Sequence, residues 1–192
     1  MNTPKDNIIR LPNDHLRTRS KKVGVINESV QTIIDEMIAA TLDWEDSRVH
    51  EVGVALAAIQ IDVSLRIVVI RSDFDNKKDR TFQVFINPEI TKLDGELVQD
   101  FEGCLSIKDI YGKVPRYARV KVKALNRNGK PIRITADGFL ARIFQHEIDH
   151  TNGKLFIDHI RHEPSTFYKL QDDGQLKELD YEKDIRANSI LW

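Results

Sequence analysis

The stretch RVKVKALNRNGKPIRITADGFLARIFQHEIDHTNG, residues 119–153, decides the fold. Apolar and charged residues alternate strictly at its start, and the alternation resumes after Asn128-Gly129. A period of two residues is typical of a β-strand with one solvated face, and Asn-Gly is a strong signal for a tight hairpin turn. We therefore predict two antiparallel strands joined at this dipeptide.

The second part of the stretch, residues 138–153, predicts a helix. Asp137 can cap its N-terminus, and Asn152-Gly153 can end it. Apolar residues occupy nearly every face of the helix, so we expect it to be buried by the strands around it. The predicted fold class is α+β, with mostly antiparallel sheets packed around a buried central helix.

Three polar residues lie within this apolar helix. At 3.6 residues per turn, His146, Glu147 and His150 share one face. Two imidazoles one turn apart can both bind a first-row metal ion, while the glutamate beside them accepts a proton from water. Ordinary polar residues are the alternative, but buried polar groups without partners are costly, which favours a metal site.

A catalytic metal ion usually has three protein ligands and one open position, so a third ligand must come from elsewhere. A zinc endopeptidase would supply a downstream His or Glu. The histidine spacing of that class is absent here, although Glu163 is formally available. Cys104, in FEGCLS, would instead give a Cys-His-His centre. A lone cysteine is more often a small buried residue, so spacing alone leaves both readings open.

The rest of the chain indicates one domain. Residues 27–44 have helical spacing with Asn27 as N-cap, and strand-like runs occupy 65–70, 81–90 and 95–101. No composition shift marks a domain boundary. We predict a single catalytic domain at 1–165 and a mixed-charge C-terminal extension at 166–192.

Composition limits the function classes. The 192 residues include 31% charged and 41% hydrophobic residues, with a net charge of -1, so nothing global indicates binding to nucleic acid or membrane. One cysteine allows no internal disulfide. The first 17 residues have no signal-peptide pattern, and no segment reaches the length of a membrane span. We therefore expect a cytoplasmic protein.

Three motifs, in order, resemble those of peptide deformylases: GVALAAIQ at 53–60, EGCLS at 102–106 and QHEIDH at 145–150. Flanking segments are also similar, and the resemblance extends over most of residues 8–160. It implies hydrolysis of the N-formyl group from the formylmethionine of nascent polypeptides, with release of formate. The implied ligands of one divalent metal ion, Fe(II) first and Zn(II) or Ni(II) as substitutes, are Cys104, His146 and His150.

The resemblance also implies roles for other residues. Glu147 would be the general acid/base, and Gln60 with the backbone N–H of Leu105 would stabilise the oxyanion. The substrate groove and the methionine pocket would be lined by Val54, Ala55, Glu102, Gly103, Phe139, Arg142 and Ile143.

The chain departs from the family pattern at several of these positions. Ala55 replaces a glycine in the groove, Ile59 replaces a proline, and Tyr111 stands near a common arginine position. Arg142 stands where an apolar residue is common. We expect its stem to cover apolar surface with the guanidinium in water, and hypothesise that it narrows or recharges the pocket rim.

Two other functions are weighed against deformylation. Ala55 and Arg142 motivate a metallohydrolase of the same scaffold that acts on another N-acyl or peptide substrate. A non-enzymatic binding protein is disfavoured, because every expected metal and proton-transfer residue is present. The remaining histidines, read as surface or structural residues, are His15, His50, His159 and His162.

The expected partners are N-formylmethionyl peptides. Acidic residues outnumber basic ones in the extension, so contact with ribosomal RNA through it is unfavourable. A transient ribosome encounter through another surface stays open. The acidic residues concerned are Asp172, Asp173, Glu178, Asp180, Glu182 and Asp184.

Overall fold

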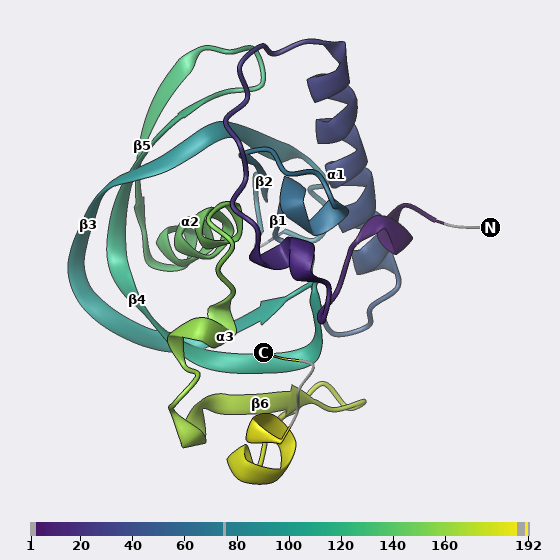
Figure 1. Cartoon of the computed structure of the whole chain (residues 1–192), viewed down its shortest axis with the longest axis vertical. Helices are drawn as coiled ribbons and strands as arrows, with labels where there is room; N and C mark the ends of the chain where they lie inside the picture. The colour runs from purple at the N-terminus through teal and green to yellow at the C-terminus, as the bar shows by residue number, and fades with distance from the viewer. Residues whose placement is uncertain (1–2, 75, 188–190, 192) are drawn as a thin grey trace.

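The computed structural model describes residues 3–74, 76–187 and 191 (Figure 1). Its α-helices are α1 (Glu28–Asp46), α2 (Gly138–Thr151) and α3 (Phe156–His159). Its strands are β1 (Ala55–Ala57), β2 (Ile67–Arg71), β3 (Phe82–Cys104), β4 (Ile107–Leu125), β5 (Pro131–Asp137), β6 (Phe167–Leu170) and β7 (Leu176–Glu178). Short 3-10 helices lie at Pro4–Asn7, Asp14–Arg17, Ala58–Ile61 and Pro164–Thr166, and a π-helical turn lies at Tyr181–Arg186.

Within the described residues the strands form one seven-stranded sheet in the order β1-β2-β3-β4-β6-β7, with β5 paired to β4. Every pairing between these strands is antiparallel. The predicted α+β class with mostly antiparallel pairing is confirmed. Figure 1 shows α2 inside the curve made by β3, β4 and β5.

The curve follows from the length and irregularity of β3. The two predicted strands at 81–90 and 95–101 are one strand in the structure, with register shifts at several points along its pairing with β4. Asp94-Gly95 reads as a break in the sequence, but Gly95 has a φ of 78° within the continuous strand. Bulges of this kind bend a strand and increase its twist, so the ribbon can wrap around a helix.

The predicted hairpin is confirmed. β4 and β5 pair from Leu125/Pro131 to Arg119/Asp137, and the Asn126 and Gly129 backbones close the turn. Asp137 occupies the N-cap position of α2, but its carboxylate makes no cap hydrogen bond and accepts from Arg119 Nε instead. The cross-strand cation therefore competes with the predicted cap.

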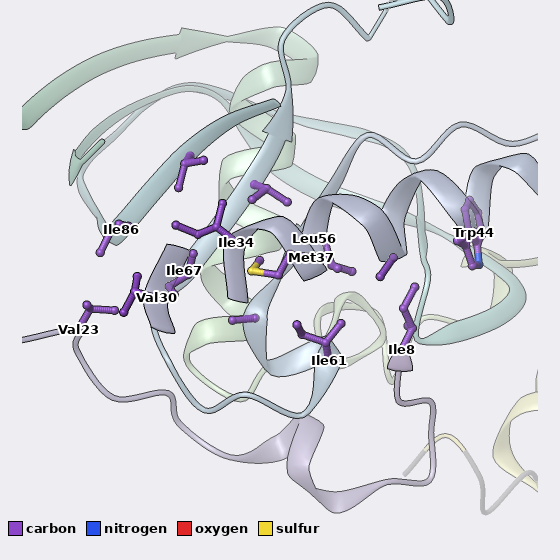
Figure 2. Packing of buried hydrophobic residues seen from close by; sticks show 14 residues of the cluster. Ile8, Val23, Val30, Ile34, Met37, Trp44, Leu56, Ile61, Ile67 and Ile86 are labelled. Atoms are coloured by element: carbon purple, nitrogen blue, oxygen red, sulfur yellow. The ribbon is translucent and has the colours of Figure 1, made fainter. Parts of the chain in front are cut away.

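Two apolar layers position α2. On one side of the sheet, α1 packs Ile34 and Met37 against Leu56 and Ile67 (Figure 2). On the other, α2 packs against β2 and β3, where the rings of Phe85 and Phe144 meet edge-to-face with centroids 4.9 Å apart. Burial of these side chains contributes most of the stabilisation and fixes the helix beneath the β3–β4 ribbon.

A third apolar layer joins the C-terminal residues to the rest of the chain. β6 pairs with residues 110–112 of β4, and β7 pairs with β6. Phe167, Ile185 and Leu191 are buried in the same cluster as Cys104. The described part of the extension is thus packed on the domain, and the division at 165/166 stays a prediction. Among the described residues, no helix combines the length and apolar character needed to cross a membrane.

Candidate metal centre and substrate cavity

The ends of two elements bring three ligand atoms together. Cys104 ends β3, and His146 and His150 lie one turn apart on α2. Cys104 Sγ is 3.3 Å from His150 Nε2, which is 3.2 Å from His146 Nε2. The three ligand atoms lie within 4.8 Å of one another. Cys104 and His150 are buried and His146 is partly buried, and Glu163, the alternative third ligand, is not part of this cluster.

This donor set fits a divalent first-row metal ion, because a thiol and two imidazole nitrogens face one point. His146 Nδ1 lies 2.9 Å from Glu102 Oε2, which orients the ring and leaves Nε2 free for a metal. Burial by itself lowers the pKa of His146, but contacts with Cys104 and Glu102 raise it well above its usual value. Burial, followed by the charge of His146, lowers the pKa of His150 well below its usual value, so the two imidazoles are shifted in opposite directions.

Glu102 is the hub that holds His146. Its carboxylate accepts from Arg116 Nε at 2.9 Å and Nη2 at 3.1 Å, and from Arg142 Nη1 at 2.8 Å. Burial would raise the pKa of Glu102, but hydrogen bonds from His146 and Arg116 hold it well below the usual range. Glu102 is therefore ionised. It lines the cavity, and it also orients His146, which the sequence did not indicate.

A further carboxylate and an imidazole extend the network. Asp149 Oδ2 accepts from Arg116 Nη1 and lies 2.7 Å from His159 Nε2. His159 was expected to be a surface or structural residue, and it has a structural contact here. A chain of polar contacts thus runs from His159 through Asp149 and Arg116 to Glu102.

Glu147 lies beside the ligand cluster on α2 and lines the cavity. It is 5% exposed, and its Oε2 has no hydrogen-bond partner among the described residues. Burial raises the pKa of Glu147 to about 7. A carboxyl group with such a pKa can both accept and release a proton near neutral pH.

Gln60 contacts Cys104 directly. Its Nε2 donates to Cys104 Sγ at 3.4 Å and to Ser106 Oγ at 3.1 Å, while its Oε1 accepts from the Ala57 backbone N–H. The 3-10 helix Ala58–Ile61 holds Gln60 in this position without the proline that Ile59 replaces. Leu105 follows Cys104 in the turn between β3 and β4 and lines the cavity.

One cavity, about 200 Å³ in volume, contains most of these groups. The predicted site residues in its lining are Val54, Ala55, Gln60, Glu102, Gly103, Cys104, Leu105, Phe139, Arg142, Ile143, His146 and Glu147. His150 is buried and contacts Cys104 and His146 without lining the cavity. The cavity is also lined by five residues for which no lining role was predicted: Trp44, Glu51, Val52, Phe101 and Tyr111.

Two of these residues have sequence features that could have indicated a role in the cavity. Phe101 directly precedes the EGCLS motif, and Tyr111 was noted only as a departure. Tyr111 explains Gly103, because a Cβ at Gly103 would lie 2.6 Å from the Tyr111 ring. Trp44 comes from the end of α1, so only the tertiary fold brings it to the cavity.

Arg142 corrects an expectation. Its guanidinium was expected in water, but the residue is 5% exposed. Nη1 donates to Glu102 and, at 2.7 Å, to the Val114 carbonyl, while Nη2 donates to the Val98 carbonyl at 2.6 Å. The bent β3–β4 ribbon passes over this turn of α2 and offers these acceptors. Phe139, by contrast, is 46% exposed.

Comparison with known proteins identifies the family. A model of the family described as polypeptide deformylase matches residues 5–165. Peptide deformylase 1 of Pseudomonas syringae pv. tomato is 42% identical over 182 residues, which cover 94% of this chain and 98% of that protein. The peptide deformylase of Chromobacterium violaceum is 44% identical and is matched over 80% of this chain and 86% of its own length.

Solved structures agree. A peptide deformylase from Legionella pneumophila has a TM-score of 0.70 at 46% identity and covers 79% of this chain and 83% of its own. One from Synechococcus elongatus, in complex with actinonin, has a TM-score of 0.73 at 35% identity, with 81% and 80% covered. The chain therefore belongs to the peptide deformylase family, the metal-dependent hydrolases that remove the N-formyl group from the formylmethionine of nascent polypeptides.

Proposed function

We propose that Cys104, His146, His150 and Glu147 carry out this hydrolysis, which releases formate from N-formylmethionyl peptides. The observation that supports it most is the meeting of a thiol and two imidazole nitrogens beside a buried carboxyl group that has a free oxygen. This arrangement provides three ligands together with a group that can move a proton.

Cys104, His146 and His150 would hold one divalent metal ion. When bound, the ion acts as a Lewis acid that activates water and polarises the formyl carbonyl. Fe(II) is the first choice and Zn(II) or Ni(II) are substitutes, since a thiolate with two imidazoles does not discriminate sharply among them. Glu102 keeps the His146 ring turned toward the ion.

Glu147 moves the proton. In the proposed reaction it takes a proton from the attacking water and later gives it to the amine nitrogen as the bond between formyl carbon and nitrogen breaks. Its pKa of about 7 suits both directions of transfer. Gln60 Nε2 and the Leu105 backbone N–H donate to the formyl oxygen as negative charge develops there.

The substrate lies along the remaining lining of the cavity. In the proposed complex the peptide backbone runs past Val54, Ala55 and Gly103, and the methionine side chain packs between Phe139 and Ile143. The stem of Arg142 would form part of the same pocket wall.

A second function is favoured by a specific observation. Arg142 lines the cavity while its buried guanidinium binds Glu102 and backbone carbonyl groups, and Ala55 adds a methyl group to the groove. Both changes alter substrate fit and leave the reacting groups intact. A metallohydrolase that prefers a different N-acyl group or first residue is therefore the alternative, and a panel of formyl- and acetyl-peptides with varied first residues separates the two.

The partners and location belong to the same proposal. The substrates are formylmethionyl peptides, met in the cytoplasm as they are synthesised. A transient ribosome encounter would use a surface other than the extension, because several of its exposed residues are carboxylates.

The test is formate release from formyl-Met-Ala-Ser by anaerobically purified protein, with the metal content measured. Cys104→Ala and Glu147→Ala are assayed beside it. The proposal predicts release by the wild type, loss of metal and activity in Cys104→Ala, and loss of activity with metal retained in Glu147→Ala. A metal-loaded wild type that released no formate would contradict the proposal and direct attention to the acyl-peptide panel.

A further inference from the structure

The C-terminal extension lies beside the substrate cavity. Residues 166–187 follow the region that the family model matches, and Figure 1 shows β6 outside the curve that encloses α2. We propose that this extension forms the outer wall of the substrate groove and binds the third and later residues of the formyl peptide. The inference rests on the proposed function, since it concerns the same peptide.

The cavity adjoins a second hollow toward the extension. The hollow has a volume of about 320 Å³, and Glu51 lines both it and the cavity. One side comes from residues 47–51 and 108–109, and the other from residues 170–172 of the extension. Because the formyl group must react beside Cys104 and Glu147, the hollow offers a continuation for the later residues of the peptide.

β6 supports two residues of the cavity wall. In the sheet, Tyr168 lies opposite Tyr111, which lines the cavity. The ring of Tyr168 also packs edge-to-face on Phe101, another lining residue, with centroids 4.9 Å apart. Lys113 Nζ lies 5.2 Å from the Phe101 ring centroid and 5.1 Å from that of Tyr168. Tyr168 therefore fixes the position of an aromatic wall of the cavity.

The turn between β6 and β7 supports the loop on the other side of the hollow. His50 Nε2 lies 3.2 Å from the Asp172 carbonyl oxygen. A Cβ at Gly174 would lie 2.9 Å from the His50 ring, so only glycine allows this close approach. His50 directly precedes Glu51, and the docked turn therefore holds the residue at which the cavity and the hollow meet.

The chemistry of the hollow suits a peptide backbone. Its charged side chains are largely paired with one another: Arg48 binds Asp109 at 3.0 Å and Glu51 at 3.4 Å. Such a lining offers polar contacts without a strong net charge or a large apolar surface. An extended peptide presents N–H and C=O groups at every residue and advances about 3.3 Å per residue, so later residues enter the hollow with little sequence preference.

The experiment compares peptide lengths in the full chain. Formyl-Met-Ala and formyl-Met-Ala-Ser-Ala-Ser are hydrolysed by the metal-loaded wild type, Tyr168→Ala and His50→Ala, and kcat and KM are measured separately. Lys177→Ala, an exposed change on β7 outside the hollow, is the matched control. Tyr168→Phe keeps the ring and tests for rescue.

The proposal predicts that the wild type has a lower KM for the longer peptide. Each alanine variant raises that KM about fivefold more than it raises the KM for formyl-Met-Ala, because the shorter peptide does not reach the hollow. Lys177→Ala and Tyr168→Phe behave as the wild type. Equal losses on both peptides, or a wild-type KM independent of length, would overturn the proposal. Hydrolysis of formyl-Met-Ala separately reports the proposed function.

Discussion

The metal end of the cavity and its substrate wall are built in different ways. At the metal end, Cys104, His146 and His150 come from two rigid elements, and His146 contacts one charged hub, Glu102. The substrate wall draws residues from α1, a loop, β3, β4 and α2, and includes the exposed Phe139. The difference indicates that the metal end needs one long-range contact, between β3 and α2, while the substrate wall depends on many.

The largest expected effect is a loss of kcat in a variant that changes the proton-transfer group and leaves the substrate wall intact. Glu147→Gln removes the proton acceptor but keeps the shape of the side chain, so we expect kcat to fall about a thousandfold. Metal content and the KM for formyl-Met-Ala-Ser should change little, because Glu147 is not a proposed ligand. Steady-state formate release with metal analysis measures both, and Glu182→Gln on the exposed π-helical turn is the control. If kcat were retained in Glu147→Gln, Glu147 would not be the proton-transfer group.

A change at the hub should affect both ends of the cavity. Glu102→Gln leaves the Arg116 and Arg142 guanidinium groups buried beside a neutral amide, so we expect the free energy of unfolding to fall by about 3 to 5 kcal/mol. Because His146 loses its ionised partner, metal affinity should fall about 10- to 100-fold. Urea denaturation of the metal-free protein and competition with a chelator measure the two effects. Unchanged metal affinity would show that His146 needs no such support.

A substitution at Arg142 tests the substrate wall separately from the metal end. Arg142→Ile removes a donor from four acceptors, of which Glu102 still accepts from Arg116, and it restores an apolar residue. We therefore expect a loss of about 3 kcal/mol in unfolding free energy and a new ranking of first residues in the substrate panel. Arg119→Ile, a change at an exposed arginine on β4, should cost within about 0.5 kcal/mol and leave the ranking unaltered. The same ranking for Arg142→Ile and the wild type would rule out a specificity role for Arg142.

The smallest effect tests the groove. Ala55→Gly removes one methyl group beside the substrate backbone, and we expect KM to fall about threefold while kcat is retained. The added backbone freedom in β1 should cost about 1 kcal/mol of stability. Kinetics with formyl-Met-Ala-Ser and thermal denaturation are the measurements. A rise in KM would mean that the Ala55 methyl group contacts the substrate favourably.

The contrast between the metal end and the substrate wall also explains which features could be predicted from the sequence. The β4–β5 hairpin, α2 and the shared face of His146 and His150 follow from local periodicity and one Asn-Gly turn. The continuity of β3 through Gly95 could not be read, because a glycine looks the same at a bulge and at a loop.

Long-range contacts account for the other misses. The buried position of Arg142 depends on carbonyl groups that β3 and β4 supply only after the ribbon has curved around α2. The pairing of Tyr168 with β4 was hidden in a segment whose mixed charge carried no strand pattern. Residues that rely on such contacts form most of the substrate wall, and the sequence therefore described the metal end better.

Titration of the metal-free protein with Co(II) tests the central claim most directly. A cobalt ion bound by Cys104, His146 and His150 should give one equivalent of tight binding and a thiolate-to-metal charge-transfer absorption in the near ultraviolet. The account predicts that Cys104→Ser loses this absorption and that Glu147→Gln keeps it. The same absorption in Cys104→Ser, or its absence in a wild type that binds one cobalt ion, would contradict the proposed Cys-His-His centre.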